Sequence, residues 1–284
     1  MTRDNSEMIG MNSAAELVLK PHTGWQPVDW QEIWRGRELF TFLVWRDIKI
    51  RYKQTVLGGL WAIFQPLLAM LIFTAVFGRL AGIQTDGPPY PLFAYSGLVV
   101  WTFFANSVSM SSNSLVGNQV LVSKIYFPRV FIPLASIGAL LLDFFIGLLL
   151  MFGLMIYYRW PLSADCVWIP LYILGTLLTS SGLGLILSAL NVGFRDVKYV
   201  VPFFIQMGLF VSPVIYPLSH VPARFRVFLG LNPMSGMITG FRQSVLGGAT
   251  DWGFVSASFA MSAVLFVAGL FIFRRMERRF ADII

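Results

Sequence analysis

Six apolar stretches, separated by short polar or charged segments, dominate the pattern along this chain of 284 residues. They cover residues 59–80, 91–116, 130–158, 167–190, 200–216 and 252–273. A helix needs about 20 apolar residues to cross the hydrocarbon core of a bilayer, so each stretch except 200–216 is comfortably long enough. That shorter stretch contains or adjoins Pro202, Pro213 and Pro217. The pattern predicts an all-α integral membrane protein with six transmembrane helices.

A further helix is predicted immediately before the first apolar stretch. In residues 28–46 the apolar side chains fall roughly on one helical face, which comprises Trp30, Ile33, Trp34, Phe40, Leu43 and Val44. This arrangement is typical of an amphipathic helix lying in the membrane interface. The following residues, RDIKIRYK at 46–53, suit either a last helical turn or an extended connector. Residues 1–27 carry charges and two prolines but no apolar signal-peptide core, so we expect a cytoplasmic, partly disordered segment.

Residues 217–250, before the last apolar stretch, are too apolar for an exposed loop. Two short helical patterns, at 224–231 and 233–246, are separated by the helix breaker Asn232-Pro233. Neither is long enough to span, so the pair predicts a re-entrant helical hairpin. Because backbone at that depth is buried in protein or faces water, the hairpin is expected to line or close a cavity. The alternative is an amphipathic flap on the outer surface.

The distribution of Lys and Arg predicts the orientation of the spans. Fourteen of these cations flank the span ends on the side of the termini, namely Arg35, Arg37, Arg46, Lys49, Arg51, Lys53, Lys124, Arg129, Arg195, Lys198, Arg274, Arg275, Arg278 and Arg279. Five lie on the opposite side, namely Arg79, Arg159, Arg224, Arg226 and Arg242. Cytoplasmic loops carry the excess of Lys and Arg, so both termini are predicted to be cytoplasmic.

Composition excludes an ordinary soluble domain and gives no sign of an enzyme. Hydrophobic residues make up 56% and charged residues 12% of the chain, against about 25% charged in soluble domains. The net charge of +7 fits loops facing an anionic leaflet, so no nucleic-acid partner is expected. With one cysteine, two histidines and no phosphate-binding loop, no catalytic or metal-binding constellation can be assembled. Energy for any work is therefore expected from another subunit.

Asp143 is the acidic residue deep inside an apolar stretch, LLDFFIGLLL. An intramembrane carboxylate is costly, which makes it a functional candidate, although a structural hydrogen bond between helices or across a dimer is favoured. The small residues Ser180, Gly184 and Ser188 indicate close helix packing. The serine-rich segment 107–113 indicates either such packing or one polar wall of a hydrated path. Most aromatic residues are expected to face lipid or core, and the remainder to stack on sugar rings.

Two short loops on the predicted cytoplasmic side have the features of a contact site. Residues 118–129, NQVLVSKIYFPR, combine a basic residue with the large apolar residues Ile125, Tyr126 and Phe127. Residues 191–198, NVGFRDVK, are compact and charged. Exposed apolar residues rimmed by charge predict a groove on a partner protein.

Four segments together resemble the type-2 ABC exporter permeases, and more closely the branch that exports O antigen, teichoic acid and galactan. They are WRDIKIRYKQTVLGGLWAIFQP at 45–66, SKIYFPR at 123–129, NVGFRDVKYVVPFFIQMGLFVSPVIYP at 191–217 and LNPMSGMITGFRQSVLGG at 231–248. The resemblance implies one type-2 ABC transmembrane domain at 28–284. It also implies a homodimer in a bacterial cytoplasmic membrane, with two separate ATPase subunits that bind ATP and Mg²⁺, so that this chain needs no cofactor.

The resemblance further implies roles for three sets of residues. A coupling helix within 122–129 would seat in the ATPase through Lys124, Ile125, Tyr126, Phe127, Pro128 and Arg129. An entrance would attract an anionic, pyrophosphate-linked lipid and reshape at a Leu-Gly loop, using Arg46, Lys49, Arg51, Lys53, Leu57, Gly58 and Gly59. An outer gate would contain Pro213, Tyr216, Pro217, Asn232 and Pro233. A channel at the dimer centre, lined by aromatic rings, would carry the sugar chain.

Two other functions remain open from the sequence. One is an integral-membrane glycosyltransferase or acyltransferase, which would need an acidic pair or a histidine at a membrane face. The other is a type-2 permease for a drug or a small lipid, which shares the fold but does not need aromatic residues along the whole path.

Overall fold

The computed structural model describes residues 34–53, 60–125, 127–277 and 280, and every regular element within them is a helix. Five apolar segments in this part of the chain are long enough to cross a membrane. They are α3 with the π-helix η1 (Leu60–Phe73 and Thr74–Leu80), α4 (Tyr90–Gly117), α6 (Phe131–Tyr157), η2 with α7 (Ala164–Trp168 and Ile169–Gly193) and α11 (Trp252–Glu277). The predicted all-helical class is confirmed, and these five segments match five of the six predicted spans.

The predicted span at 200–216 is shorter than expected. The helix there, α8, covers Val197–Val211, and residues 212–217 form a turn. Pro213 explains this end, because a proline lacks an N–H donor and disfavours helical backbone at the residue before it. Ser212 accordingly has extended dihedral angles.

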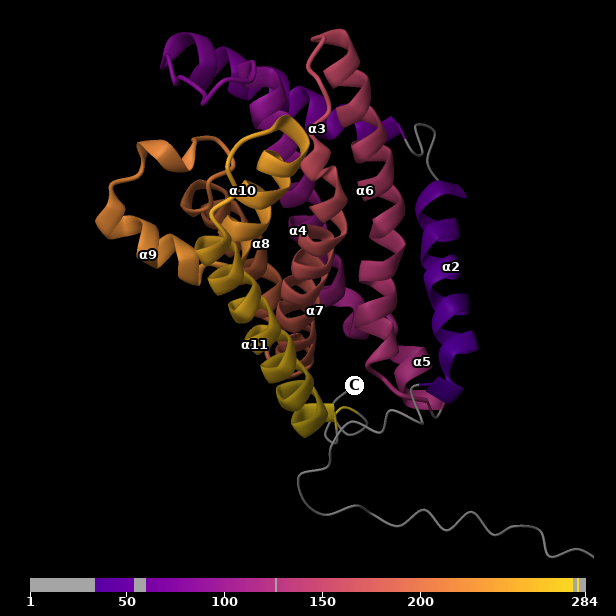
Figure 1. Ribbon diagram of the computed structural model, residues 1–284. Helices are drawn as coiled ribbons and strands as arrows, with labels where there is room; N and C mark the ends of the chain where they lie inside the picture. Colours follow the sequence, from indigo (N-terminus) through magenta and orange to yellow (C-terminus); the bar gives the residue numbers. More distant parts are fainter. Residues whose placement is uncertain (1–33, 54–59, 126, 278–279, 281–284) are drawn as a thin grey trace, which may run out of the picture.

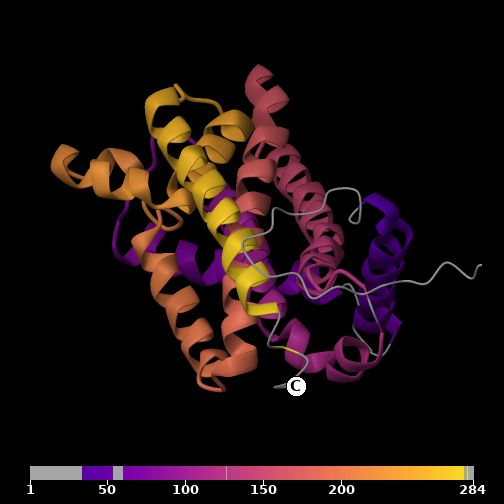
Figure 2. The same ribbon diagram turned by 90° about the horizontal axis from the view of Figure 1, so that it is seen from below.

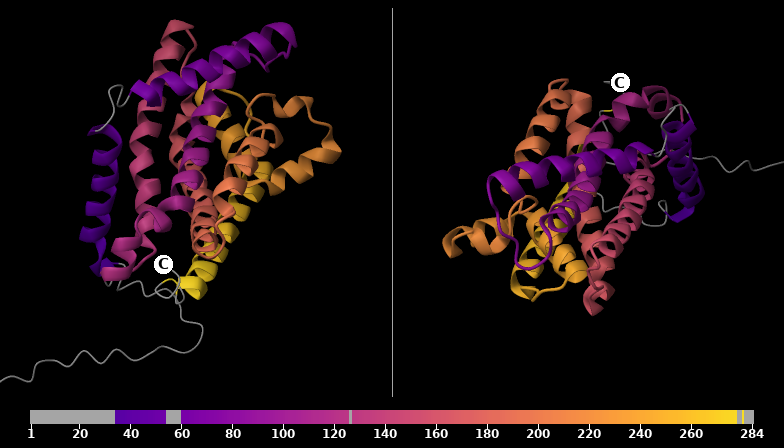
Figure 3. Two further views of the ribbon diagram at one scale, coloured as in Figure 1. Left: turned by 180° about the vertical axis from the view of Figure 1, so that it is seen from behind. Right: turned by 90° about the horizontal axis from the view of Figure 1, so that it is seen from above.

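Helix α4 lies at the centre of the bundle and is the most buried of the five candidate spans. It packs against α7 and α6 over much of its length, and also against α10, α3 and α8. By contrast α3 with η1 is the least buried, and runs obliquely across the end of the bundle where α6 ends (Figure 3). The central position of α4 therefore places its polar residues between neighbouring helices.

Small residues allow the closest approaches around α7. A Cβ atom on Gly184 would lie 2.5 Å from Ser111 Oγ of α4, and one on Gly269 would lie 2.5 Å from the carbonyl oxygen of Gly182. Ser180 and Ser188 are fully buried. The predicted packing role of the stripe at 180–188 is confirmed. The serine-rich segment 107–113 takes part in the same packing, since Ser107, Ser111 and Ser112 are buried.

The N-terminal helix differs from its prediction in extent, and it packs on a neighbouring helix. Helix α2 covers Arg37–Lys53, so RDIKIRYK at 46–53 is helical and not an extended connector. It packs lengthwise against α6 (Figure 1), where Leu43 is buried and Phe40 contacts the ring of Phe131. Trp34, predicted on the apolar face that meets the membrane interface, is 70% exposed in the single chain. The expected helix lying flat in the interface is not confirmed, and residues 28–33 lie outside the described part.

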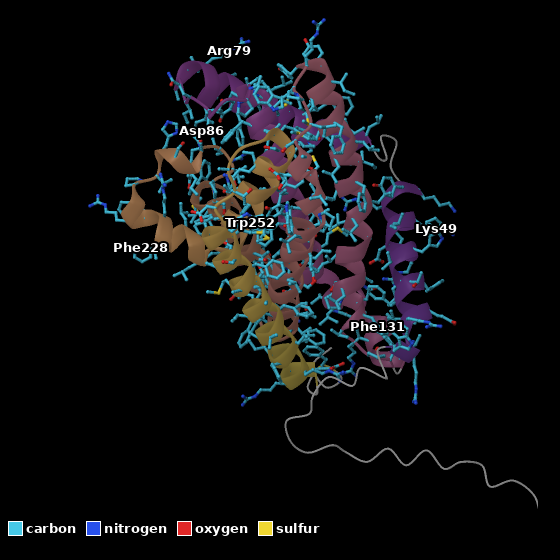
Figure 4. The ribbon with its side chains drawn as sticks, viewed as in Figure 1. Lys49, Arg79, Asp86, Phe131, Phe228 and Trp252 are labelled. Atoms are coloured by element: carbon cyan, nitrogen blue, oxygen red, sulfur yellow. The ribbon has the colours of Figure 1, made fainter. Side chains whose placement is uncertain are left out.

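The two ends of the bundle carry different elements. The start of α2, the short helix α5 (Gln119–Lys124) and the end of α11 lie at one end (Figure 1). At the opposite end lie Arg79 and Asp86, together with α10 (Pro233–Leu246) (Figures 1 and 4). Seen along the bundle, α2 and α8 occupy opposite sides of it (Figure 2).

Helices α9 (Ala223–Leu231) and α10 coincide with the two predicted short helices, and Asn232 caps α10 by accepting a hydrogen bond from the N–H of Met234 at 3.1 Å. Their environments differ. Helix α10 is buried against α4, α7 and α11, whereas α9 projects from the bundle with Phe228 69% exposed (Figure 4). A flap lying wholly on the surface therefore does not describe this pair.

Candidate functional site

The basic residues of α2 do not form a uniform cationic surface. Arg46 pairs with Asp47 at 2.8 Å, and the Lys49 ammonium lies 5.4 Å from the centre of the Trp45 ring. Lys53 is exposed at the end of the helix. Leu57, Gly58 and Gly59, the predicted reshaping joint, lie outside the described residues. The part of the predicted entrance that is described thus has Lys49 and Lys53 as its outward-facing cations.

Arg51 turns instead toward the intramembrane carboxylate of α6. Its Nη2 lies 2.7 Å from Asp143 Oδ2, and its Nη1 donates to the thioether sulfur of Met110 at 3.0 Å. Tyr52 also donates a hydrogen bond to Asp143. Burial and this hydrogen bond raise the pKa of Tyr52, so its hydroxyl keeps the proton that it donates. The structure therefore joins the deep carboxylate and the basic segment, which the sequence pattern treated as separate features.

Desolvation of the two charges limits how much the Arg51–Asp143 pair can stabilise the fold. A carboxylate and a guanidinium that leave water together gain little net stability, because the desolvation of both opposes their attraction. Removing one partner alone is expensive, because it strands the other charge. The Asp143 side chain is 13% exposed and that of Arg51 33%. The pair joins α2 to α6 and is expected to add little net stability to the fold.

The predicted coupling segment is only partly helical and only partly exposed. Helix α5 ends at Lys124, and Ile125 is 54% exposed, whereas Phe127 is buried at 9% in a cluster with Phe131 and Phe273. The expectation that Phe127 faces the cytoplasm is wrong, because its side chain belongs to a buried apolar cluster with residues of α6 and α11. Tyr126 lies outside the described residues.

Arg129 ties the same segment to the end of the last helix. Its backbone N–H donates to Glu277 Oε1 at 3.2 Å, and its guanidinium donates to the Glu277 carbonyl at 2.8 Å. Lys124 and Ile125 remain at the surface, beside a shallow groove between the ends of α4 and α5. Pro128 is half-buried. Among the described residues of the predicted coupling segment, the exposed ones are therefore Lys124 and Ile125.

The predicted outer-gate residues gather around the turn after α8. The Asn232 amide donates to Ser212 Oγ at 2.9 Å, which joins the α9–α10 connection to this turn. Tyr216 donates to the carbonyl of Val211 at 3.2 Å, and Pro213 and Pro217 are buried. Pro233 occupies the first turn of α10, where its missing N–H costs nothing.

Arg242 of α10 organises this turn, and sequence reasoning missed it. Its guanidinium donates to the carbonyls of Pro213 and Val214, each at 2.9 Å, and to Ser96 Oγ at 3.2 Å. It also lies 3.7 Å from the centre of the Phe93 ring. Burial lowers the pKa of Arg242 to about 9, so it is a cation at neutral pH. The signal available in the sequence was a lone arginine among apolar and small residues, in MITGFRQSVL.

The contacts described above and the candidate spans indicate the class of protein. Among the described residues, no group of three or more His, Cys, Asp and Glu side chains is placed to hold a metal ion. The polar contacts join helices and turns rather than building a catalytic centre. Together with five candidate spans, they describe a multi-pass α-helical membrane protein.

Comparison with known proteins then gives the family. The family described as ABC-2 type transporter matches residues 38–246. The chain is 30% identical over 248 residues to "O-antigen export system permease protein RfbA" of Klebsiella pneumoniae, covering 87% of this chain and 95% of the relative. It is 31% identical to the protein of the same name from Myxococcus xanthus, covering 89% and 97%. It is also 26% identical to "Polysialic acid transport protein KpsM" of Escherichia coli, covering 82% and 91%. The chain belongs to the ABC-2 type transporter family, which confirms the resemblance.

Proposed function

We propose that this chain is the permease subunit of an ATP-driven exporter that moves a lipid-linked polysaccharide of the O-antigen type across the bacterial cytoplasmic membrane. The observation that carries the proposal is the similarity to two O-antigen export permeases over 87% and 89% of this chain. A type-2 permease for a small lipid or a drug would share the fold. We would not expect such a permease to align with polysaccharide export permeases over nearly its whole length.

The proposed exporter contains two copies of this chain and two separate ATPase subunits, which bind ATP and Mg²⁺. The bundle end that carries α5 offers a surface for the ATPase: Val120 and Ile125 are 68% and 54% exposed beside Lys124. Exposed apolar residues with an adjacent cation favour a protein partner over water. We assign Lys124 and Ile125 to this contact. The less exposed residues Phe127, Pro128 and Arg129 are proposed to hold the segment in position.

The second copy is proposed to cover the apolar face of α8. Aromatic residues on α8 are exposed in the single chain, with Phe203 at 58% and Phe204 at 67%. Six spans, including α8, would place both termini in the cytoplasm, as the distribution of Lys and Arg along the sequence predicts. Helix α10 and the turn that Arg242 holds would then form the outer gate.

The exposed cations Lys49 and Lys53 are proposed to attract the anionic lipid carrier, although both lie on the last turns of α2, away from the bundle end that carries α5 (Figures 1 and 4). Each such cation contributes about 1 kcal/mol of attraction to an anionic surface. Arg46 contributes less, because Asp47 already neutralises it.

Reconstitution tests the proposal directly. The purified chain is expected to hydrolyse no ATP, whereas vesicles that contain it with its ATPase should hydrolyse ATP and move a lipid-linked glycan. The ATPase with a catalytic-glutamate substitution serves as the control. ATP hydrolysis by the chain alone, or glycan movement with the inactive ATPase, would contradict the assignment. Transport of a small lipid or drug but of no glycan would favour the alternative permease function.

A further inference from the structure

A small cavity lies where α2, α3, α4 and α6 meet, beside the Arg51–Asp143 pair. It has a volume of about 60 Å³ and is partly open. Polar groups from all four helices line it: Arg51, Asp143, Gln65, Thr102 and Asn106. Trp61 adds an aromatic ring that is 55% exposed.

Three of these side chains have unused hydrogen-bonding capacity. Within the part of the chain that the structure describes, Gln65, Thr102 and Asn106 make no side-chain hydrogen bond, although Thr102 and Asn106 are half-buried. Gln65 is exposed, and none of the three belongs to the buried polar atoms that lack a partner. Their free donors and acceptors are therefore accessible to a ligand that enters from the open side of the cavity.

The charges that line the cavity limit what that occupant can be. Arg51 and Asp143 compensate each other, so an anion would face the carboxylate and a cation would face the guanidinium. A neutral, hydroxyl-rich group meets both, because hydroxyls donate to a carboxylate and accept from a guanidinium or an amide. An exposed tryptophan ring supplies an apolar face for the C–H side of a sugar.

We propose that this cavity binds the hydroxyl edge of a neutral sugar unit, with Asp143, Arg51, Gln65 and Asn106 as its hydrogen-bonding groups and Trp61 as its stacking surface. The inference rests on the proposed function, since it assigns a subsite for the glycan. A water molecule needs about 10–15 Å³ of such volume, so the cavity admits a few hydroxyl groups and not a whole ring. Its open side leaves the rest of the sugar outside.

Tyr52 and Met110 act on this site through their neighbours. Tyr52 is a positioning residue, because its hydrogen bond holds one oxygen of Asp143 while Arg51 holds the other. Met110 gives an N–H of Arg51 a thioether sulfur at 3.0 Å. Sulfur is a weak acceptor, so a sugar hydroxyl oxygen would accept a stronger hydrogen bond from this N–H of Arg51.

Sugar binding is tested on the full-length purified chain in detergent. Saturation-transfer NMR with soluble mannose, galactose and glucose oligosaccharides should show contact with at least one of them. The double variant Gln65→Met/Asn106→Leu removes both amides at nearly constant volume, and should reduce the signal at least five-fold. Phe64→Met is the matched control, because Phe64 precedes Gln65 on α3, is 47% exposed and does not line the cavity. It should keep the wild-type signal.

Transport provides the second measurement, in vesicles that contain the permease and its ATPase. The concentration of lipid-linked glycan that half-saturates ATP hydrolysis should rise five- to twenty-fold in the double variant, more than the maximal rate falls. The same lipid diphosphate without sugar should not distinguish the double variant from the wild type.

The outcomes separate the two proposals. No oligosaccharide signal in the wild type, or a wild-type signal in the double variant, overturns the sugar subsite even where glycan export is intact. Sugar contact that depends on Gln65 and Asn106, in a chain that moves no glycan, supports the subsite and rejects the exporter. Equal binding of the sugar-free lipid diphosphate, lost in Arg51→Gln but kept in the double variant, would make this a phosphate site and overturn the inference.

Discussion

At the scale of single residues, the contacts that define the candidate site could not be predicted from the sequence. A charge inside an apolar stretch is visible in the sequence, so Asp143 could be singled out as a candidate. Its partners Arg51 and Tyr52 could not, because their contact depends on α2 running lengthwise along α6. The same applies to Arg242, whose burial follows from the packing of α10 among α4, α7 and α11.

Breaking the Arg51–Asp143 pair should show whether it fixes the position of α2. Replacing either partner alone, as in Asp143→Leu or Arg51→Met, should destabilise the chain by about 1–3 kcal/mol, below the cost in a dry interior since Arg51 is partly exposed. The double variant should be less destabilised than the sum of the two. Unfolding in detergent, followed by fluorescence, measures all three. Strict additivity would show that the two side chains do not interact.

Arg242 should matter more than any other cation for the turn after α8. Arg242→Met would leave the carbonyls of Pro213 and Val214 without their donor, at about 2–4 kcal/mol in total. Gly97→Ala should act on the same contact from α4, because the added methyl group would meet the guanidinium. Both variants should increase protease cleavage within residues 212–217, whereas Arg224→Met, an exposed control, should not. Unchanged cleavage in Arg242→Met would contradict this role.

At the scale of elements, the apolar pattern predicted the helices well and their surroundings less well. The ends of α4, α6 and α10 agree with the pattern to within a residue. Where the prediction failed, a local backbone rule or a tertiary contact decided the outcome. Helix α8 ends early at Ser212-Pro213, while α2 continues to Lys53 because its last turns pack on α6. Amphipathicity alone gives a helix's apolar face but not which neighbour covers it.

The coupling segment offers a test in which two neighbouring apolar residues have opposite roles. Phe127→Ala should destabilise the chain by about 3 kcal/mol, because it leaves a cavity among Phe131 and Phe273. Ile125→Ala should leave stability unchanged, because its side chain is exposed, and should reduce glycan-stimulated ATP hydrolysis. Thermal unfolding and ATPase assays of both variants separate packing from coupling. Full activity in Ile125→Ala would remove Ile125 from the ATPase contact.

The crossing of α7 and α11 should tolerate no side chain larger than hydrogen. A methyl group on Gly182 would lie 2.5 Å from the carbonyl oxygen of Leu265, a backbone atom that cannot turn aside. Gly182→Ala should therefore destabilise the chain by more than 2 kcal/mol or prevent folding. Gly193→Ala on the same helix meets nothing within 4 Å and should be neutral. Detergent stability of the two variants provides the comparison, and equal values would contradict the close crossing.

At the scale of the whole molecule, α8 is the one predicted span that is shorter than a helical crossing needs. Its 15 residues extend about 22 Å, against about 30 Å of hydrocarbon. The buried turn at 212–217 could complete the crossing, because its carbonyls have donors: Arg242 serves Pro213 and Val214, and Tyr90 serves Ile215 at 2.9 Å. Non-helical backbone is tolerated at membrane depth only when protein satisfies it in this way.

If α8 and the turn at 212–217 together cross the membrane, the two ends of α8 face opposite sides of it. In a Cys166→Ser background, Arg195→Cys precedes α8 and His220→Cys follows the turn, and both positions are exposed. A membrane-impermeant maleimide should label His220→Cys in intact spheroplasts and Arg195→Cys only after permeabilisation. Labelling of both from the same side would leave five crossings and put the termini on opposite sides. Adding Arg242→Met should then make the turn itself accessible, because the donor that permits irregular backbone at that depth would be gone.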